Sequence, residues 1–430
     1  MVYVIDINGQ PLMPTKRHGN VRRMLKSGQA KVVRRCPFTI QLLYESTTHT
    51  QPVALGIKAG SKTLGVSATT DRKVLYEAEV SLRTDIVDLL STRREARRAR
   101  RNRKTRYRKP RFDNRVHAKH KGWLAPSVKH KVDTHLTVVR KIHEFLPVTS
   151  ITAEVAAFDL QKLKADLAGL ARPKGTDYQH GEQYGFWNVR EYVLFRDGHT
   201  CQCCKGKSKD KILNVHHIES RKTGGDAPNN LVTLCETCHS GYHSGTVKLP
   251  DKIKRGASFK DATFMGIMRW AFFNRLRELY PDVRLTYGYL TKNTRISHNL
   301  EKTRFTDARC VSGHPDAVSD GTVYLQKKVR CHNRQIYKMS IGKGGVRKRN
   351  QLPYQVKGFQ LYDRVTAKGE EWYIHGRRAK GSFVLKTLDG NRPQGTLEIT
   401  PTKIHLIGRQ HGMIYERTVI QHNLQRSSPD

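Results

Sequence analysis

Two pairs of cysteines in one short stretch constrain this chain more than any other feature. Cys201 and Cys204 form one CxxC pair, and Cys235 and Cys238 form the other. Four thiolates presented by two short turns suit the tetrahedral coordination of a structural zinc ion. The sequence therefore predicts a zinc-stabilised module at residues 201–243. Cys203, next to Cys204, leaves open which of the two is the ligand.

The same stretch contains polar residues that a structural zinc does not need. They are His216, His217, Asn230, His239 and His243. Side chains of these types can bind a second, catalytic divalent cation and activate water. The stretch resembles an HNH nuclease, also called a ββα-metal module. The alternative is a zinc ribbon whose histidines only support the fold.

The charge of the chain points to a polyanionic partner. The sequence has 79 Lys and Arg against 37 Asp and Glu, a net charge of +42. Such a field neutralises phosphates, so the expected partner is nucleic acid. A membrane surface is the rival, but no long apolar run or amphipathic basic helix supports it.

The N-terminus shows no pattern typical of a signal peptide. The cysteines outside the CxxC pairs are scattered, so free thiols in a reducing cytoplasm are expected. They are Cys36, Cys203, Cys310 and Cys331.

The pattern of apolar residues predicts an α/β multidomain chain. Three hairpin-linked strands are expected at 53–57, 64–69 and 74–80, and further strands at 150–155 and 283–287. Helices are expected at 127–145, 264–280 and from 307. This order is typical of an RNase H-like core.

Smaller modules are expected at both ends of the chain. A turn containing Pro11 to Pro14 is expected within a small α+β unit at the N-terminus. Short strands of alternating polar and apolar residues after residue 358 predict a β-barrel-like module.

Residues 93–111 contain twelve Arg or Lys and one acid. The segment permits a helix, yet no face is apolar, so only a polyanion would hold it in place. Arginine predominates, which favours forked contacts to phosphate. The alternative is a disordered basic segment. The nucleic-acid-binding residues expected here are Arg93, Arg94, Arg97, Arg98, Arg100, Arg101, Arg103, Arg106 and Arg108.

Several motifs together resemble the IscB family of transposon-encoded RNA-guided nucleases. They are PLMP at 11–14, the Arg-rich segment, EVAAFDLQKL at 154–163, GFWNVREYVLFRDGHTCQCC at 185–204, VHHI at 215–218, NLVTLCETCH at 230–239, HNRQIYK at 332–338 and GFQLYDRV at 358–365. The resemblance implies an RNase H-like (RuvC) core, split by an Arg-rich bridge helix and an inserted zinc-stapled HNH domain, with a small N-terminal and a β-rich C-terminal module.

The implied domains follow one another along the chain. They are a PLMP domain (1–50), RuvC part I (51–88), the bridge helix (89–115), RuvC part II (116–175), the HNH domain with its linkers (176–250), RuvC part III (251–320), a basic connector contacting RNA or DNA (321–350), and a domain that interacts with a target-adjacent motif (351–425).

The resemblance also implies roles in the HNH centre. His217 is the expected general base, and Asn230 is expected to fix the intervening loop. His216 and His239 are expected to bind one divalent cation, Mg²⁺ or Mn²⁺, with His243 as a further candidate ligand. This centre keeps all its parts.

The RuvC centre departs from the family pattern. Where the family has an aspartate in Gly-Ile-Asp-Pro-Gly, this chain has Lys58, and Arg304 replaces a histidine. Glu154 and Asp307 remain. An ammonium cannot ligate Mg²⁺, so this centre is expected to be inactive. In that case Glu154 and Asp307 are vestigial, neutralised by Lys58 and Arg304 in a buried ion cluster; the alternative is a misaligned strand.

The sequence therefore predicts a metal-dependent DNA endonuclease acting as an RNA-guided nickase. Its expected partners are an omega guide RNA and double-stranded target DNA, in a ribonucleoprotein with one protein copy. The expected location is the prokaryotic cytoplasm, near the nucleoid. Two alternatives stay open: a guided DNA-binding protein with little cleavage, and a guide-independent HNH endonuclease.

Overall fold

The structure is a computed structural model in which the chain divides into two units. One consists of Met1–Ala157 and Phe264–Asp430, and the other of Phe158–Thr263. The described residues are 1–102, 122–155, 159–257, 259–330, 340–341, 347–348, 352–378, 380–393, 398–410 and 412–420. None of the helices in these ranges combines the length and the apolar composition that a bilayer span requires.

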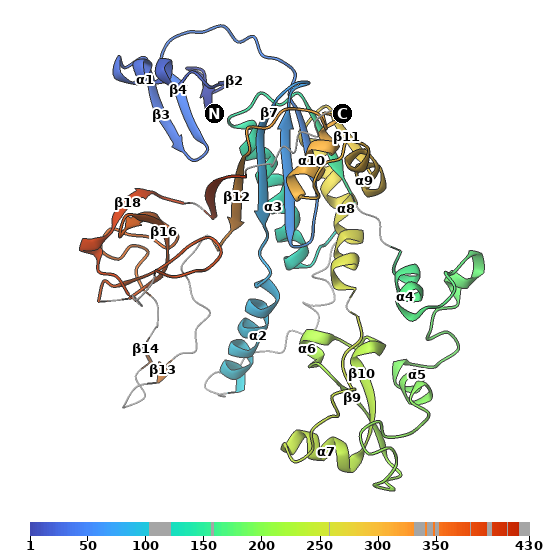
Figure 1. Ribbon diagram of the computed structural model, residues 1–430. Helices are drawn as coiled ribbons and strands as arrows, with labels where there is room; N and C mark the ends of the chain where they lie inside the picture. Colours follow the sequence, from blue (N-terminus) through green and yellow to red (C-terminus); the bar gives the residue numbers. More distant parts are fainter. Residues whose placement is uncertain are drawn as a thin grey trace, which may run out of the picture. The chain divides into compact units, whose positions relative to one another are not determined.

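A seven-stranded mixed sheet forms the centre of the larger unit (Figure 1). In spatial order the strands are β11 (Val283–Thr286), β8 (Ser150–Glu154), β5 (Ala54–Lys58), β6 (Thr63–Thr69), β7 (Val74–Ser81), β12 (Thr322–Lys328) and β19 (Met413–Val419). β5, β6 and β7 form antiparallel hairpins, whereas β8 runs parallel to both β5 and β11. The predicted RNase H-like α/β core is confirmed, and its first five strands lie within one residue of their predicted bounds.

Two strands of this sheet require a correction of the predicted domain bounds. β12 pairs parallel to β7, and β19 pairs antiparallel to β12 along its whole length. Residues 321–350 were expected to form a basic connector and 351–425 a separate C-terminal domain. β12 ends in two lysines, so its alternation of apolar and polar residues is hard to recognise in the sequence. The partner of β19 lies far from it in the sequence.

Helices cover both faces of the sheet (Figure 1): α3 (Pro126–His143), α8 (Lys260–Leu279), α9 (Gly288–Ser297) and α10 (Arg304–Ser312). Successive side chains of a strand point to opposite faces. Leu55 and Ile57 of β5 are fully buried in the core that α3 and α8 complete. Gly56 and Lys58 therefore face the other side, where α10 packs.

Helix α10 lies unusually close to the sheet because glycines face it. A β-carbon on Gly56 would lie 1.9 Å from the carbonyl oxygen of Ala308, and one on Gly65 would lie 2.1 Å from that of the first residue of α10. The buried guanidinium of Arg309 also donates to Glu77 of β7 over 2.9 Å. This contact fixes which residues α10 presents to β5.

The N-terminal module is a four-stranded sheet with one helix. Its elements are β1 (Val2–Ile5), β2 (Pro11–Thr15), α1 (His18–Lys26), β3 (Ala30–Arg35) and β4 (Phe38–Leu42), in strand order β2-β1-β4-β3. The PLMP motif, expected in a turn, lies in β2. Tyr3 packs into the core of the large sheet, where its hydroxyl donates to the Leu75 carbonyl over 2.9 Å.

The C-terminal module is an antiparallel sheet with its own apolar core. Its strands are β17 (Phe383–Lys386), β16 (Glu370–Arg377), β15 (Arg364–Ala367) and β18 (His405–Gly408), in this spatial order. Among the described residues it is an open sheet rather than the expected barrel. A short pair, β13 (Ser340–Ile341) with β14 (Arg347–Lys348), precedes it.

The Arg-rich segment begins in helix α2 (Ile86–Asn102), which starts before the expected bridge. Arg93, Arg94, Arg97 and Arg98 are exposed on this helix. The side chains of Arg100 and Arg101, all of Arg103, Arg106 and Arg108, Cys331 and the HNRQIYK motif lie outside what the structure describes.

The smaller unit contains the expected inserted domain. Its elements are α4 (Leu160–Ala168), a 3₁₀ helix η2 (Gly175–Gln179), α5 (Val189–Arg196), β9 (Leu213–His217), α6 (Arg221–Gly224), η3 (Pro228–Asn230), β10 (Leu231–Cys235) and α7 (Glu236–Ser244). The unit is wider than the predicted 176–250. Tyr178 donates from its hydroxyl to Asp159 and accepts at its carbonyl from Gln161, so α4 belongs here and not to RuvC part II.

We predict that Gly56→Ala destabilises the larger unit by about 1–3 kcal/mol or more, because the new methyl group meets the rigid backbone of α10. The matched control is Gly266→Ala in α8, whose added β-carbon has no neighbour within 4 Å. This control should stabilise the protein by about 0.5–1 kcal/mol. Urea unfolding followed by circular dichroism measures both; equal midpoints for the two variants would contradict the close approach of α10.

Candidate active site

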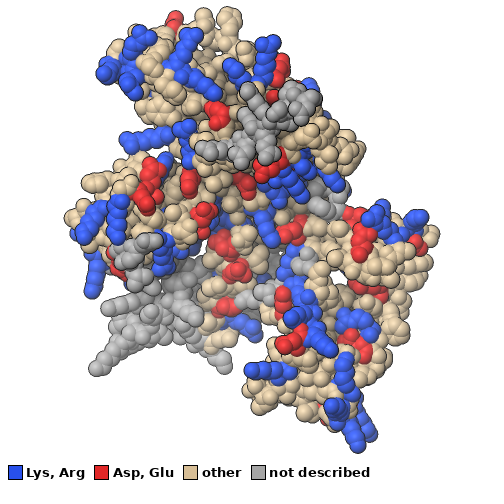
Figure 2. Space-filling view, viewed as in Figure 1, with Lys and Arg blue, Asp and Glu red and all other residues tan. Residues whose placement is uncertain are grey.

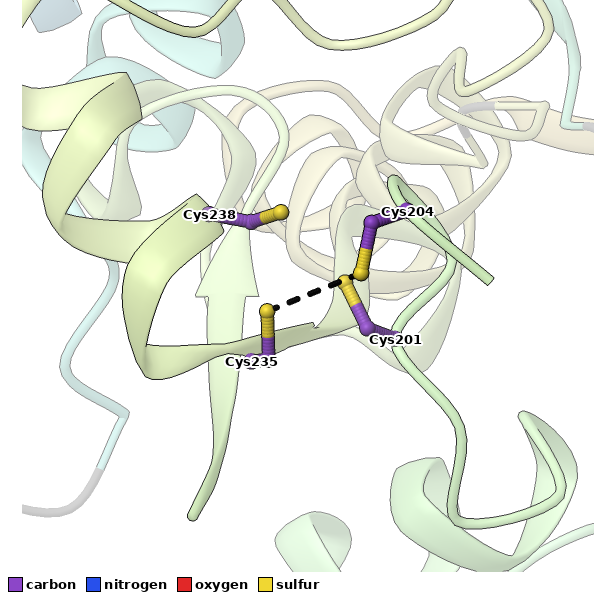
Figure 3. Close-up of side chains that lie close together, drawn as sticks. All are labelled: Cys201, Cys204, Cys235 and Cys238. Carbon is purple, nitrogen blue, oxygen red and sulfur yellow. Dashed lines mark hydrogen bonds between the residues drawn. The ribbon is translucent and has the colours of Figure 1, made fainter. Parts of the chain in front are cut away.

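Four cysteine sulfurs meet in the smaller unit (Figure 3). Cys201 and Cys204 come from the loop after α5, Cys235 ends β10, and Cys238 lies in the first turn of α7. All four sulfurs lie within 4.8 Å of one another. Cys203 is outside this cluster, so the structure resolves the alternative in favour of Cys204.

The geometry of this cluster fits zinc. With zinc–sulfur bonds of about 2.3 Å, the sulfurs of a tetrahedral site are about 3.8 Å apart. The Cys204 and Cys235 sulfurs are 3.8 Å apart. Hydrogen bonding to Ser208 lowers the pKa of the Cys204 thiol to about 6, whereas burial raises the pKa values of Cys235 and Cys238. Zinc ligands are thiolates, so zinc binding would release protons from the cluster.

A second cluster lies where β9 meets α7. β9 pairs antiparallel to β10, and α7 follows β10 directly, which gives the ββα arrangement. Ring nitrogens of His216, His239 and His243 lie within 4.8 Å of one another. The Nε2 atoms of His239 and His243 are 3.3 Å apart, as expected for residues one helical turn apart.

These three imidazoles fit a divalent cation. His216 is 6% exposed, and its Nε2 atom is buried with no hydrogen-bond partner among the described residues. Burial, with the neighbouring His239 and His243, lowers the pKa of His216 to about 4, so its ring is neutral near pH 7 and offers a lone pair. Burial also lowers the pKa of His239. Three nitrogen donors suit transition ions better than Mg²⁺, which prefers oxygen.

His217 lies outside this cluster and contacts a carboxylate. Neighbouring side chains of a strand point apart, so His217 does not share the direction of His216. Its Nε2 atom is 2.9 Å from Asp226 Oδ1. Because an ionised carboxylate only accepts, Nε2 carries the hydrogen, and in the neutral imidazole this leaves the lone pair on Nδ1. This contact and Arg221, 2.9 Å away, lower the pKa of Asp226.

Asp226 was not singled out from the sequence. It lies nine residues after His217 in a glycine-containing loop, where a turn acid is common. The sequence signal for Asp226 is its position between the HisHis pair and Asn230, and this position does not indicate that it contacts His217.

Asn230 ties the ends of that loop together. It is fully buried, and its Nδ2 donates to the carbonyls of Glu219 and Gly225, both over 2.9 Å. Its Oδ1 accepts from the amide of Glu219 over 2.9 Å. The side chain thus holds the loop that carries Asp226.

The RuvC position contains a cation between two carboxylates. Lys58 and Glu154 stand opposite each other on β5 and β8, and the Lys58 ammonium hydrogen-bonds to Glu154. The same ammonium is 3.6 Å from Asp307 of α10. Asp307 also lies 3.1 Å from Arg295 of α9. All four side chains are at most 16% exposed.

One expectation for this cluster is wrong. Arg304 was expected to neutralise the acids, but it is exposed at the start of α10, and Arg295 takes that place. The nearby His314 and Asp316 also lie elsewhere: His314 contacts Thr69 and Asp71, and Asp316 contacts His298. Among the described residues, the groups that could hold a metal ion are the Cys and His clusters of the smaller unit.

Two family models match different segments of the chain. Residues 2–181 match the family model described as RRXRR protein, and residues 201–245 match the model described as HNH endonuclease. The chain is also similar to anaredoxin from Nostoc sp., with 32% identity over 68 residues, which are 15% of this chain and 86% of that protein.

Among solved structures, the chain is similar to Cas9 from Streptococcus thermophilus in complex with AGGA PAM, with a TM-score of 0.31 and 13% identity, over 52% of this chain and 31% of that chain. The Type II-C Cas9 enzyme from Actinomyces naeslundii gives a TM-score of 0.26 and 11% identity, over 61% of this chain and 60% of that chain. The chain spans about a third of the length of the Streptococcus protein.

The two family models together cover just over half of the chain, in the order that the motifs predicted. The N-terminal part of the chain therefore matches the RRXRR family model, the smaller unit carries an HNH endonuclease domain, and both matches are consistent with the resemblance to the IscB family.

Proposed function

We propose that this protein is an RNA-guided DNA nickase in which the HNH centre hydrolyses the guide-paired strand and the RuvC centre is inactive. The observation that carries the proposal is the contrast between the two centres. The HNH centre has converging histidines and a histidine–carboxylate pair, whereas the Lys58 ammonium stands between the two remaining RuvC acids.

In the HNH centre, His217 acts as the general base. Asp226 accepts the hydrogen on Nε2, so Nδ1 is free to take a proton from the attacking water. Asn230 holds the loop that positions Asp226. His216, His239 and His243 would hold a divalent ion, which would supply charge stabilisation at the scissile phosphate.

The donor sets argue for two different ions. The cysteine cluster fits a structural Zn²⁺. At the histidine cluster, three imidazoles suit transition ions such as Zn²⁺, Fe²⁺ or Ni²⁺, and of the two expected ions only Mn²⁺ is a transition ion. Substrate phosphate oxygens and water would fill the remaining positions.

The RuvC centre lacks what a two-metal nuclease needs. Such a site uses carboxylates on both sides of the ions, with a cation separation of about 3.5–4 Å. Here two carboxylates remain, and a protonated amine holds both of them. A magnesium ion would have to displace an ammonium that the fold keeps in place.

The charge supports the proposed partners. In Figure 2, Lys and Arg side chains are spread over the visible face, with fewer acidic side chains among them. We propose a guide RNA and double-stranded target DNA as partners of one protein copy, in the nucleoid region of a prokaryotic cytoplasm. Base pairing would then supply the sequence recognition, and the protein would supply contacts to the backbone and to a target-adjacent motif.

We predict that the purified ribonucleoprotein converts a supercoiled target plasmid to open circles in Mg²⁺ or Mn²⁺, and only with its guide. His217→Ala should lower the nicking rate by about 100-fold or more and leave DNA binding intact, because the general base is lost. His180→Ala, an exposed histidine of the same unit, is the matched control and should nick normally. Gel separation of the plasmid forms measures all three.

Each other result of this assay selects a different function. A linear product would refute the inactive RuvC centre. Cutting without guide would identify a guide-independent HNH endonuclease, and a footprint without cutting would identify a guided DNA-binding protein.

Zinc removal gives a second prediction. Cys238→Ser should lower the zinc content by about one ion per chain and abolish nicking, which added Mn²⁺ should not restore, because the smaller unit loses its cross-link. Cys203→Ser, outside the cluster, should keep both zinc and activity. Elemental analysis with the plasmid assay tests this; equal zinc in both variants would contradict the assigned ligands.

A third prediction concerns Asp226 as a positioning residue. Asp226→Asn should lower the nicking rate roughly 10- to 100-fold with unchanged DNA affinity, because the amide no longer holds His217 in one tautomer. Glu182→Gln, an exposed acid of the same unit, is the control. A normal rate in the Asp226 variant would show that the contact is not used in catalysis.

A further inference from the structure

A cavity in the larger unit lies where three of its parts meet. It has a volume of about 410 Å³. The end of β3 and the turn to β4 form one wall, α3 contributes Lys141, and the C-terminal module with β19 closes the remainder. A volume of this size is within the range of about 300–1,000 Å³ that is typical of small-ligand sites.

Cations line this cavity, and no carboxylate does. The lining cations are Arg34, Arg35, Lys141, Arg364 and Arg409. Two of them have acidic partners outside the lining: Arg34 pairs with Glu144, and Arg364 pairs with Glu371. Among the described residues, the other three have no carboxylate within ion-pair distance.

Lys141 is the most informative of the three. It is half-buried, and its ammonium is 3.2 Å from the Tyr415 hydroxyl and 5.4 Å above the Tyr415 ring. Burial, followed by the charge of Arg34, lowers the pKa of this ammonium. A half-buried cation beside other cations is costly, and an anion in the cavity would relieve that cost.

The buried part of the lining is less polar than the exposed part. Met413 and Tyr415 are buried, and Cys36 and Ile407 are half-buried. Arg35 and Arg409 are exposed, as is Val33. A ligand that combines an anionic group with a flat, partly apolar body matches this distribution.

We propose that this cavity binds one nucleotide of a nucleic-acid strand, with its phosphodiester held by Arg35, Lys141 and Arg409. The proposal rests on the proposed nucleic-acid function, but it assigns a site to residues outside the Arg-rich helix. Guide RNA and displaced DNA share this chemistry, and the two arms of the test separate them.

The test compares charge-matched variants of the full chain. The cavity variant combines Arg35→Gln, Lys141→Gln and Arg409→Gln. The control combines Arg22→Gln, Lys292→Gln and Lys403→Gln, three exposed cations elsewhere in the same unit. Fluorescence anisotropy measures the affinity for a short single-stranded RNA and for the DNA of the same sequence, across a salt series.

We expect the cavity variant to bind about tenfold more weakly than the control and to lose about one more unit of salt slope for each phosphate contact removed. A larger loss with RNA identifies guide RNA as the ligand, and a larger loss with DNA identifies a DNA strand. Equal affinities of the two variants for both probes would overturn the proposal.

Two further measurements keep the result interpretable. A double variant with only Arg35→Gln and Arg409→Gln spares the half-buried Lys141, and it should show the same direction of change with an unaltered melting temperature. A photoreactive thiouridine in the RNA, or thiothymidine in the DNA, should cross-link to Tyr415 or Met413. Cavity-dependent binding without guided nicking would refute the nickase while leaving this site in place.

Discussion

The ammonium of Lys58 connects three elements of the larger unit. It stands between Glu154 of β8 and Asp307 of α10 and is itself on β5. Two carboxylates that face each other in a shielded site repel unless a cation lies between them. Here that cation is covalently part of the sheet. Removing one partner of such a cluster costs more than the pair contributes, because it leaves a buried charge without compensation. The close packing of α10 on Gly56 keeps Asp307 within reach.

The histidine cluster differs from the RuvC position because it contains no carboxylate. Three imidazoles converge there, and burial lowers the pKa of His216 to about 4, so its ring is neutral near pH 7. A divalent ion that enters this centre is held by the lone pairs of the imidazoles, and no side-chain cation has to leave first. At the RuvC position, the acids are already paired with Lys58 and Arg295, which belong to the chain and stay in place. The two centres thus differ in whether their ligand atoms are open to a metal ion.

Local patterns in the sequence predicted the parts of the site that depend on spacing. The CxxC pairs, the HisHis pair on β9 and the i,i+4 histidines of α7 needed no knowledge of distant contacts. The residues that were missed act across long separations. Arg295 contacts Asp307 from another helix, and β12 pairs with β7 and β19, neither of which is adjacent to it in the sequence. Asp226 was missed because a turn acid has no distinctive spacing. Arg304 was expected to neutralise the acids, but it is exposed at the start of α10.

The cations of the larger unit fall into two classes, and the division supports a nucleic-acid partner. Buried cations are paired: Arg309 with Glu77, and Lys58 with Glu154. The cations of α2 instead stand exposed at i,i+4 spacing, where like charges destabilise a helix. An apolar core does not compensate this repulsion, because the apolar residues in the arginine-bearing part of α2 are two alanines, Ala96 and Ala99. The charge of Lys141 is not compensated by an acid either, because no carboxylate among the described residues lies within ion-pair distance of its ammonium. A polyanion would compensate both, so binding it would stabilise α2 and the surroundings of Lys141.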